Sequence, residues 1–345
     1  MERLDQGLVE WLLEENSPWV RYNTLVELLD KNKRDDEVAR ALEDAMKTPP
    51  ISKILGQLEK GGFYDESASS RWGKSAMESG YFPKYRGFAW KALFLAQAGA
   101  DPNDSRVEAL GEYLLSHSFN PELNTFDVPL KLSEGYDVDF LMPCFIGNMV
   151  WTLCRLGFSD RAEVRKGFDW LVRYQRYDDG CWMTPTVFPY RGRRERCWGS
   201  HTCYWGITKL LRAMTIVPEG YWTCESKDAK RKAVDFVILH RLLWSSHDPS
   251  KPVAQKNTRP QRLTTPLTYY DDAIEITSTL LSLGVENDSI EDAVEYVLSK
   301  RNERGRWICE NTPGPLDAKF GFKGQESKWI TFRAIKMLKL AGRIS

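Results

Sequence analysis

The stretch CFIGNMVWTLCRLG at residues 144–157 decides the fold, because it is one copy of a pattern that returns about every 57 to 68 residues. Each copy opens with polar and aromatic residues, continues through an apolar helical stretch and ends at a small residue or a proline. The other copies begin near Arg86, His201, Tyr270 and Ser327. A fixed period of this length indicates stacked helical pairs, with the polar and aromatic clusters at the same end of each first helix.

Helical spacing of apolar residues and capping signals place the expected helices. The first helix of each pair is expected near 17–30, 86–98, 143–156, 201–216, 270–283 and 328–341. The second helix of each pair is expected near 35–46, 104–117, 160–176, 227–241 and 288–302, and an inserted helix near 50–60. A further helix at 3–14 supplies the missing second helix of the sixth pair if it packs beside the helix at 328–341. The sequence therefore predicts an all-α fold, a single closed (α/α)6 toroid over residues 1–345. Residues 1–62 form a more divergent N-terminal region that completes the barrel.

Bulk properties exclude several classes of protein. The chain has 345 residues with 48 basic and 48 acidic side chains, so nothing favours a nucleic-acid partner. No apolar run has the length of a membrane span, and the N-terminus lacks the apolar region of a signal peptide. We expect a cytoplasmic protein whose seven cysteines are reduced thiols.

Two segments resemble a known repeat. Residues 166–175 (KGFDWLVRYQ), followed by Asp179-Gly180-Cys181-Trp182, are similar to the QW motif of prenyltransferases and squalene cyclases, and residues 293–298 with Gly305-Arg306-Trp307 form a weaker copy. More broadly, the chain resembles bacterial and archaeal prenyltransferase and squalene-oxidase repeat proteins. The resemblance implies an α/α toroid and a terpenoid- or prenyl-processing enzyme. The acid motif of the cyclases is incomplete, since Asp137-Val138-Asp139-Phe140 lacks its final Asp.

Helix N-termini supply the first candidate site. In a closed toroid the inner helices are parallel, so their N-termini converge at one mouth and favour an anionic group there. Cys144 follows Pro143 at a helix start, where the dipole lowers the pKa of a thiol, and His201 and Cys203 begin the next inner helix. We expect Cys144, His201, Cys203 and Asp272 around one mouth. The first three are candidate zinc ligands, candidate acid, base or nucleophile, or simply core and capping residues.

Acidic residues supply further candidates. Asp271, Asp272 and Glu275 form a cluster suited to Mg²⁺, although acids are also common in a helical first turn. Asp137 and Asp139 are candidate general acids or solvated loop residues. Our catalytic candidates are His201, Cys203, Cys144, Asp139 and Asp272.

Aromatic residues gather at the starts of the inner helices. Such rings stabilise carbocations, stack on sugars or fill a core. A basic loop that precedes His201 offers guanidinium groups to an anion. The candidate substrate-binding residues are Tyr85, Trp90, Arg193, Arg194, Tyr204, Tyr269, Tyr270 and Trp329.

Three functions remain open. The first is a terpenoid or prenyl enzyme, a transferase or isomerase that takes an apolar small molecule with an anionic head, with zinc or Mg²⁺ as its possible metal and no nucleotide cofactor. The second is a glycan-processing (α/α)6 enzyme, which an open groove would favour. The third is a non-catalytic helical-repeat binding protein, which a filled lumen would favour.

Overall fold

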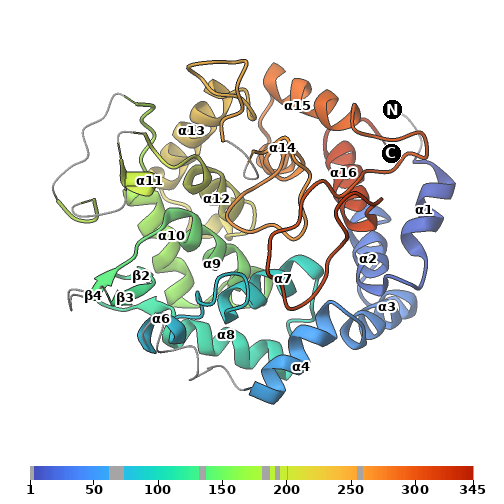
Figure 1. Cartoon of the computed structure of the whole chain (residues 1–345), viewed down its shortest axis with the longest axis horizontal. Coiled ribbons are helices and arrows are strands. Elements are labelled where there is room, and N and C mark those ends of the chain that lie inside the picture. Colours follow the sequence, from blue (N-terminus) through green and yellow to red (C-terminus); the bar gives the residue numbers. More distant parts are fainter. Residues whose placement is uncertain are drawn as a thin grey trace. The chain divides into compact units, whose positions relative to one another are not determined.

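The computed structural model describes residues 4–61, 74–131, 137–180, 187–190, 195–199, 201–254 and 259–344, with the backbone alone at 60–61, 130–131, 137–139 and 195–196. These residues are mostly helical (Figure 1), so the predicted all-α class is confirmed. Backbone contacts divide the chain into two compact units. Unit 1 comprises Met1–Gln57, Phe94–Asp101 and Ile238–Ser345, and unit 2 comprises Leu58–Leu93 and Pro102–Val237.

Unit 1 contains the two ends of the chain. Its helices are α1 (Gln6–Leu13), α2 (Pro18–Asn23), a π-helical turn (Thr24–Leu28), α3 (Asp36–Lys47), α14 (Ala273–Ser282), α15 (Asp288–Leu298) and α16 (Lys328–Leu340). Two further helices, α4 (Ile51–Gly61) and α7 (Phe88–Ala98), belong partly to each unit. Side-chain caps begin several of these helices, because Asp5, Asn287 and Ser327 each accept a hydrogen bond from a first-turn amide.

Unit 2 holds the central helical pairs and the few strands. Its helices are α6 (Lys74–Glu78), α8 (Ser105–His117), α9 (Pro143–Arg155), α10 (Ala162–Tyr174), α11 (Glu195–Trp198), α12 (Tyr204–Met214), a 3₁₀ turn (Glu219–Tyr221) and most of α13 (Cys224–Leu239). Strand β1 (Phe119–Asn120) pairs antiparallel with β2 (Thr125–Phe126), and β3 (Pro129–Lys131) pairs antiparallel with β4 (Asp137–Asp139). None of the helices in the described residues has the length and apolar character needed to cross a bilayer.

The helices of unit 2 alternate between fully and partly buried. Every residue of α12 is buried, and most residues of α9 are buried as well. Helices α10 and α13 each bury only one face. A Cβ on Gly206 would lie 2.8 Å from Pro143 Cβ, and one on Gly147 would lie 2.7 Å from Lys209 Cβ. The first contact joins Pro143 of α9 to Gly206 of α12, and the second joins later residues of both helices, Gly147 and Lys209. Helices α9 and α12 are therefore parallel neighbours that meet at their N-terminal ends.

The predicted packing of the N-terminal helix beside the last helix is confirmed within unit 1 (Figure 1). Lys328 Nζ of α16 lies 2.8 Å from Glu14 Oε2, just beyond the end of α1. The rings of Trp19 and Trp329 lie 4.6 Å apart, and the Trp19 ring also packs on Phe320. Helices α2 and α16 thus share one aromatic core.

The QW-like residues connect helix ends. Gln175, which follows α10, donates through Nε2 to Thr202 Oγ1 at 3.2 Å, just before α12. In the weaker copy, the buried Trp307 donates through Nε1 to the carbonyl of Val297 in the last turn of α15, at 2.7 Å. Trp307 thus satisfies a carbonyl at the end of α15, and Gln175 connects the end of α10 to the start of α12. Trp182 of the first copy lies outside the described residues.

Candidate functional site

Two thiols meet where α9 and α12 begin. Cys203 is the N-cap residue of α12, and Cys144 is the second residue of α9, directly after Pro143. Cys144 is buried and Cys203 is partly buried. The Cys144 thiol donates a hydrogen bond to the sulfur of Cys203. The repeat predicted that Cys144 and Cys203 begin neighbouring helices, and the two thiols do meet at the starts of α9 and α12.

The two thiols differ in acidity. The hydrogen bond from Cys144 lowers the pKa of Cys203, and the backbone amides of Trp205 and Gly206 lower it further. Because Cys144 is the donor and is buried, its own pKa is raised well above the usual value. We expected a lowered pKa at Cys144, but the lowered pKa is that of Cys203, while the pKa of Cys144 is raised.

Cationic side chains surround this thiol pair. The ammonium group of Lys84 lies 4.9 Å from the centroid of the Tyr85 ring and interacts electrostatically with Cys144. Partial burial lowers the pKa of Lys84. The fully buried Lys209 interacts with Cys144 from within α12. Two lysines thus interact with Cys144 where the N-termini of α9 and α12 meet.

The backbone beside Lys84 is strained. Tyr85 has a φ of 66°, in the left-handed region that a bulky L-residue rarely adopts. Such strain costs about 1 to 3 kcal/mol and is concentrated at functional sites. It holds the Tyr85 ring 5.1 Å from the ring of Trp90 at the start of α7.

Aromatic rings continue from this point toward the thiols. The Tyr81 ring lies 5.5 Å from Trp90 and 5.4 Å from Phe145, the residue after Cys144. Trp90 is buried and donates through Nε1 to the carbonyl of Tyr81 at 2.8 Å. The candidates Tyr85 and Trp90 therefore belong to the same aromatic cluster as the start of α9.

His201 takes a different position from the one we expected. The helix α12 begins at Tyr204, so His201 lies before the N-cap and forms an isolated antiparallel bridge with Asp179. Its side chain is 60% exposed, and its Nδ1 lies 3.8 Å from Asp179 Oδ1. The ring packs so closely on Gly180 that a Cβ there would lie 2.4 Å from Cε1.

The thiol pair and His201 do not fit a common metal site. In the part of the chain that the structure describes, the ligand atoms of Cys144, His201 and Cys203 do not all lie within 4.8 Å of one another. Three zinc ligands at about 2.0–2.3 Å from one ion need such proximity. The chemistry of this site therefore rests on the thiols themselves.

The other aromatic candidates pack in cores. Tyr204 is buried against Trp205 and Phe236 in unit 2. In unit 1, the rings of Tyr269 and Tyr270 lie 5.1 Å apart. Trp329 is buried in the aromatic core described above. Tyr270, which is only partly buried, keeps part of its ring accessible.

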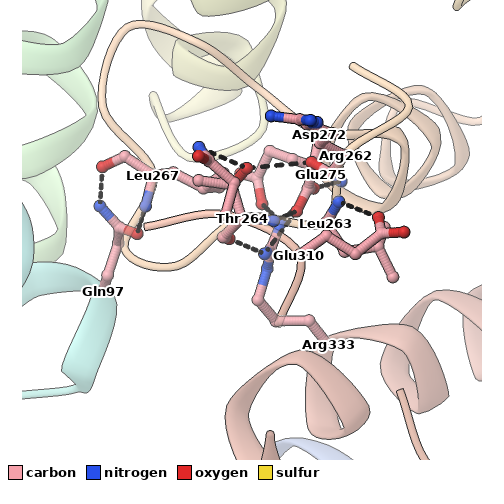
Figure 2. Close-up of polar contacts among 10 residues, drawn as sticks. Gln97, Arg262, Leu263, Thr264, Leu267, Asp272, Glu275, Glu310 and Arg333 are labelled. Atoms are coloured by element: carbon pink, nitrogen blue, oxygen red, sulfur yellow. Dashed lines mark hydrogen bonds and ion pairs between the residues drawn. The ribbon is translucent and has the colours of Figure 1, made fainter. Parts of the chain in front are cut away.

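Asp272 forms a buried ion pair in unit 1. Its Oδ1 lies 2.6 Å and its Oδ2 3.0 Å from the guanidinium nitrogens of Arg333 in α16 (Figure 2). Asp272 also caps α14 by accepting from Glu275 N, and it accepts from Thr264 N at 2.9 Å. Burial alone would lower the pKa of Arg333, but the charges of Asp272 and Glu275 raise it. Asp272 thus has a structural role.

The acidic cluster does not fit a Mg²⁺ site. Arg333 Nη2 also lies 3.3 Å from Glu275 Oε2, so one guanidinium group pairs with both carboxylates. A divalent cation would have to displace this buried arginine. The cluster therefore joins α14 to α16.

Three predicted residues cannot be placed as side chains. Arg193 and Arg194 lie outside the described residues. Asp139 lies in β4, where the backbone alone is described.

The sequence reasoning missed Lys84, Lys209 and Arg333. Lys209 in α12 and Arg333 in α16 each have apolar neighbours in the helix, and a charged residue in that position is itself a signal of a buried partner. Lys84 has a weaker signal, since it directly precedes Tyr85, a candidate substrate-binding residue.

Alkylation of the thiols tests the assignment of charge. Because its pKa is lowered, Cys203 should react with iodoacetamide at a lower pH than an ordinary cysteine. Cys144→Ala removes the donor, so the pKa of Cys203 should rise and its rate below pH 8 should fall several-fold. Peptide mass spectrometry measures the rate at each cysteine.

Two controls accompany this measurement. Cys154, whose pKa burial raises to about 12, should stay unmodified in the folded protein. Cys154→Ala removes a buried thiol elsewhere on α9 and should leave the Cys203 profile unchanged. Equal profiles for Cys203 in the original protein and in Cys144→Ala would refute the hydrogen-bonded pair.

Comparisons with known proteins do not add a family to this geometry. A scan against models of protein families and a search of curated proteins each gave no match to the chain.

Proposed function

We propose that this chain is a terpenoid- or prenyl-processing enzyme that binds an apolar molecule with an anionic head at the start of α9 and α12. The observation that carries the proposal is the meeting of the two helix N-termini at the Cys144–Cys203 pair. Unpaired amides and the partial positive charge of each helix end favour an anion there. Lys84 adds a cation beside Cys144.

Aromatic residues support the apolar part of the substrate. Tyr81, Tyr85, Trp90 and Phe145 form a continuous set of ring contacts that leads away from the thiols. Such rings provide apolar walls and π faces that stabilise carbocations. A glycan-processing enzyme would also use aromatic rings, but a neutral sugar chain does not require the lysines and helix N-termini.

The fold proposed for this enzyme is the (α/α)6 toroid that the QW-like segments imply. Support comes from the parallel pair α9 and α12 in unit 2 and from the packing of α1 beside α16 in unit 1. Alternation of fully buried and partly buried helices also favours inner and outer rings. The same proposal places the protein in the cytoplasm, where the six described cysteines would remain the free thiols observed.

In the proposed reaction, Cys203 supplies the reactive group and the lysines hold the anionic head. The thiol of Cys144 and the backbone amides of Gly206 and Trp205 lower the pKa of Cys203. This arrangement suits nucleophilic or base chemistry near neutral pH.

Ligand-induced stabilisation tests the proposal. Farnesyl or geranylgeranyl diphosphate should raise the thermal midpoint by several degrees, because saturation to about 100 times Kd adds about 2.7 kcal/mol to the free energy of unfolding. Neutral oligosaccharides should give no comparable shift. Differential scanning fluorimetry measures both.

A lysine variant locates the anionic head. Lys84→Met should remove most of the shift produced by the diphosphates. Lys166→Met makes the same chemical change on the exposed face of α10 and should keep the shift. An oligosaccharide shift without a diphosphate shift would favour the glycan-processing alternative, and equal shifts in the two variants would contradict the placement of the anion.

A further inference from the structure

A cavity lies in unit 1. It has a volume of about 470 Å³, within the range of small-molecule sites. Its walls come from the segment after α13, from the segment that precedes Leu263, from the end of α15 and from Glu310. All of these residues belong to unit 1.

The charge of the cavity lining is unbalanced. Arg259, Arg262 and Lys300 line it together with a single carboxylate, that of Glu310. Lys300 Nζ lies 2.7 and 2.9 Å from the two oxygens of Glu310, so this lysine offsets the acid. The guanidinium groups of Arg259 and Arg262 line the cavity outside this ion pair. Arg259 is exposed, and its side chain makes no hydrogen bond or ion pair with any of the other described residues. Such a lining favours an anion with several oxygens.

Aromatic rings form another wall of the cavity. Trp244 and Tyr296 pack edge to face, with centroids 6.4 Å apart and an interplanar angle of 87°. Lys300 covers one face of Tyr296, with its Nζ 5.2 Å from the ring centroid. Trp244 is partly buried and offers an apolar surface to a ring-shaped ligand.

Hydrogen-bond acceptors complete the site. Gln261 is 7% exposed, and its Nε2 donates to the carbonyl of Leu243 at 2.8 Å. Its buried Oε1 has no hydrogen-bond partner among the described residues. Glu310 accepts two bonds from Lys300 and one from Leu263 N, which leaves a carboxylate lone pair for a further donor. The ligand should therefore carry hydroxyl groups as well as negative charge.

The geometry points to a binding site for a phosphorylated sugar in this cavity. The phosphate would lie against the guanidinium groups of Arg259 and Arg262, where planar donors match phosphate oxygens. The sugar ring would pack on Trp244, and its hydroxyl groups would donate to Glu310 and Gln261. This site is independent of the proposed prenyl chemistry, because it shares no residue with the thiol pair.

Calorimetric titration of the full chain with glucose 6-phosphate tests this inference. We expect saturable binding with a Kd below about 1 mM, and binding of glucose and of inorganic phosphate at least about tenfold weaker. No binding of glucose 6-phosphate at about 10 mM would overturn the site. Phosphate that bound as tightly as the sugar phosphate would overturn the role of the sugar ring.

Matched variants locate the binding. Arg259→Ala and Trp244→Ala should each weaken binding about tenfold or more, an effect typical of a lost charged or aromatic contact. Arg34→Ala removes an exposed arginine from a different part of unit 1 and should leave the affinity unchanged. Thermal midpoints of all three variants identify any loss of folding. Equal affinities in folded Arg259→Ala and Arg34→Ala would refute the inference, whatever happens at the thiol site.

Discussion

Replacement of Arg333 with Leu is expected to lower the free energy of unfolding by about 3 to 5 kcal/mol, the cost of removing one partner from a buried ion pair. Arg333 is 7% exposed and Asp272 is 1% exposed, so the carboxylate left behind cannot be solvated without opening the structure. The same substitution removes the second contact to Glu275 and a hydrogen bond to the carbonyl of Thr264. Urea denaturation followed by circular dichroism measures the loss.

An exposed arginine provides the matched control for this prediction. Arg343 pairs with Glu291 and Glu295, but all three side chains are largely solvated. Arg343→Leu should therefore change the free energy of unfolding by less than about 1 kcal/mol. If Arg333→Leu were no more destabilising than Arg343→Leu, the ion pair would not connect α14 to α16 as described.

A double variant separates the charge from the packing. Arg333→Leu with Asp272→Asn leaves no unpaired charge at the pair itself, so part of the lost stability should return. Recovery should be incomplete, because Asp272 also accepts hydrogen bonds from the amides of Thr264 and Glu275. A double variant less stable than Arg333→Leu alone would contradict this account.

Most of the helices could be predicted from the sequence because their signals are local. Asn287 caps α15 one residue before the acidic first turn that marked it, and Pro143 begins α9 where the sequence placed a helix start. The strands were not predicted, because pairs such as β1 and β2 have two residues each and show no period. The π-helical turn at Thr24–Leu28 likewise lies inside an ordinary helical pattern.

The candidate site was predicted in part. The repeat phase correctly brought Cys144 and Cys203 to neighbouring helix starts, because it depends only on where each helix begins. Which sulfur carries the charge depends on the direction of one hydrogen bond, and sequence spacing does not contain that information. His201 was misplaced because two residues, Thr202 and Cys203, separate it from the first residue of α12, and its ring packs on Gly180 instead.

Gly147→Ala should destabilise the protein by about 1 to 3 kcal/mol, the usual cost of an added methyl group in a close-packed core. The new Cβ would lie 2.7 Å from Lys209 Cβ, 2.8 Å from its carbonyl oxygen and 2.9 Å from its carbonyl carbon. Two of these three atoms are backbone, so no side-chain rotation relieves the overlap, and α9 must move away from α12. Alanine is otherwise the better helix former by about 1 kcal/mol, so a net loss reports the contact between the helices.

Separation of α9 from α12 also predicts a chemical effect at their N-termini. Cys144 lies one helical turn before Gly147, so a shift of α9 should lengthen the hydrogen bond to Cys203 and raise the pKa of that thiol. Alkylation of Cys203 below pH 8 should then slow, as in Cys144→Ala. Gly56→Ala is the control, because a Cβ there meets nothing within 4 Å and should stabilise α4 by about 0.5 to 1 kcal/mol. If Gly147→Ala stabilised the protein as Gly56→Ala should, or left Cys203 as reactive as before, the close parallel packing that assembles the thiol pair would be wrong.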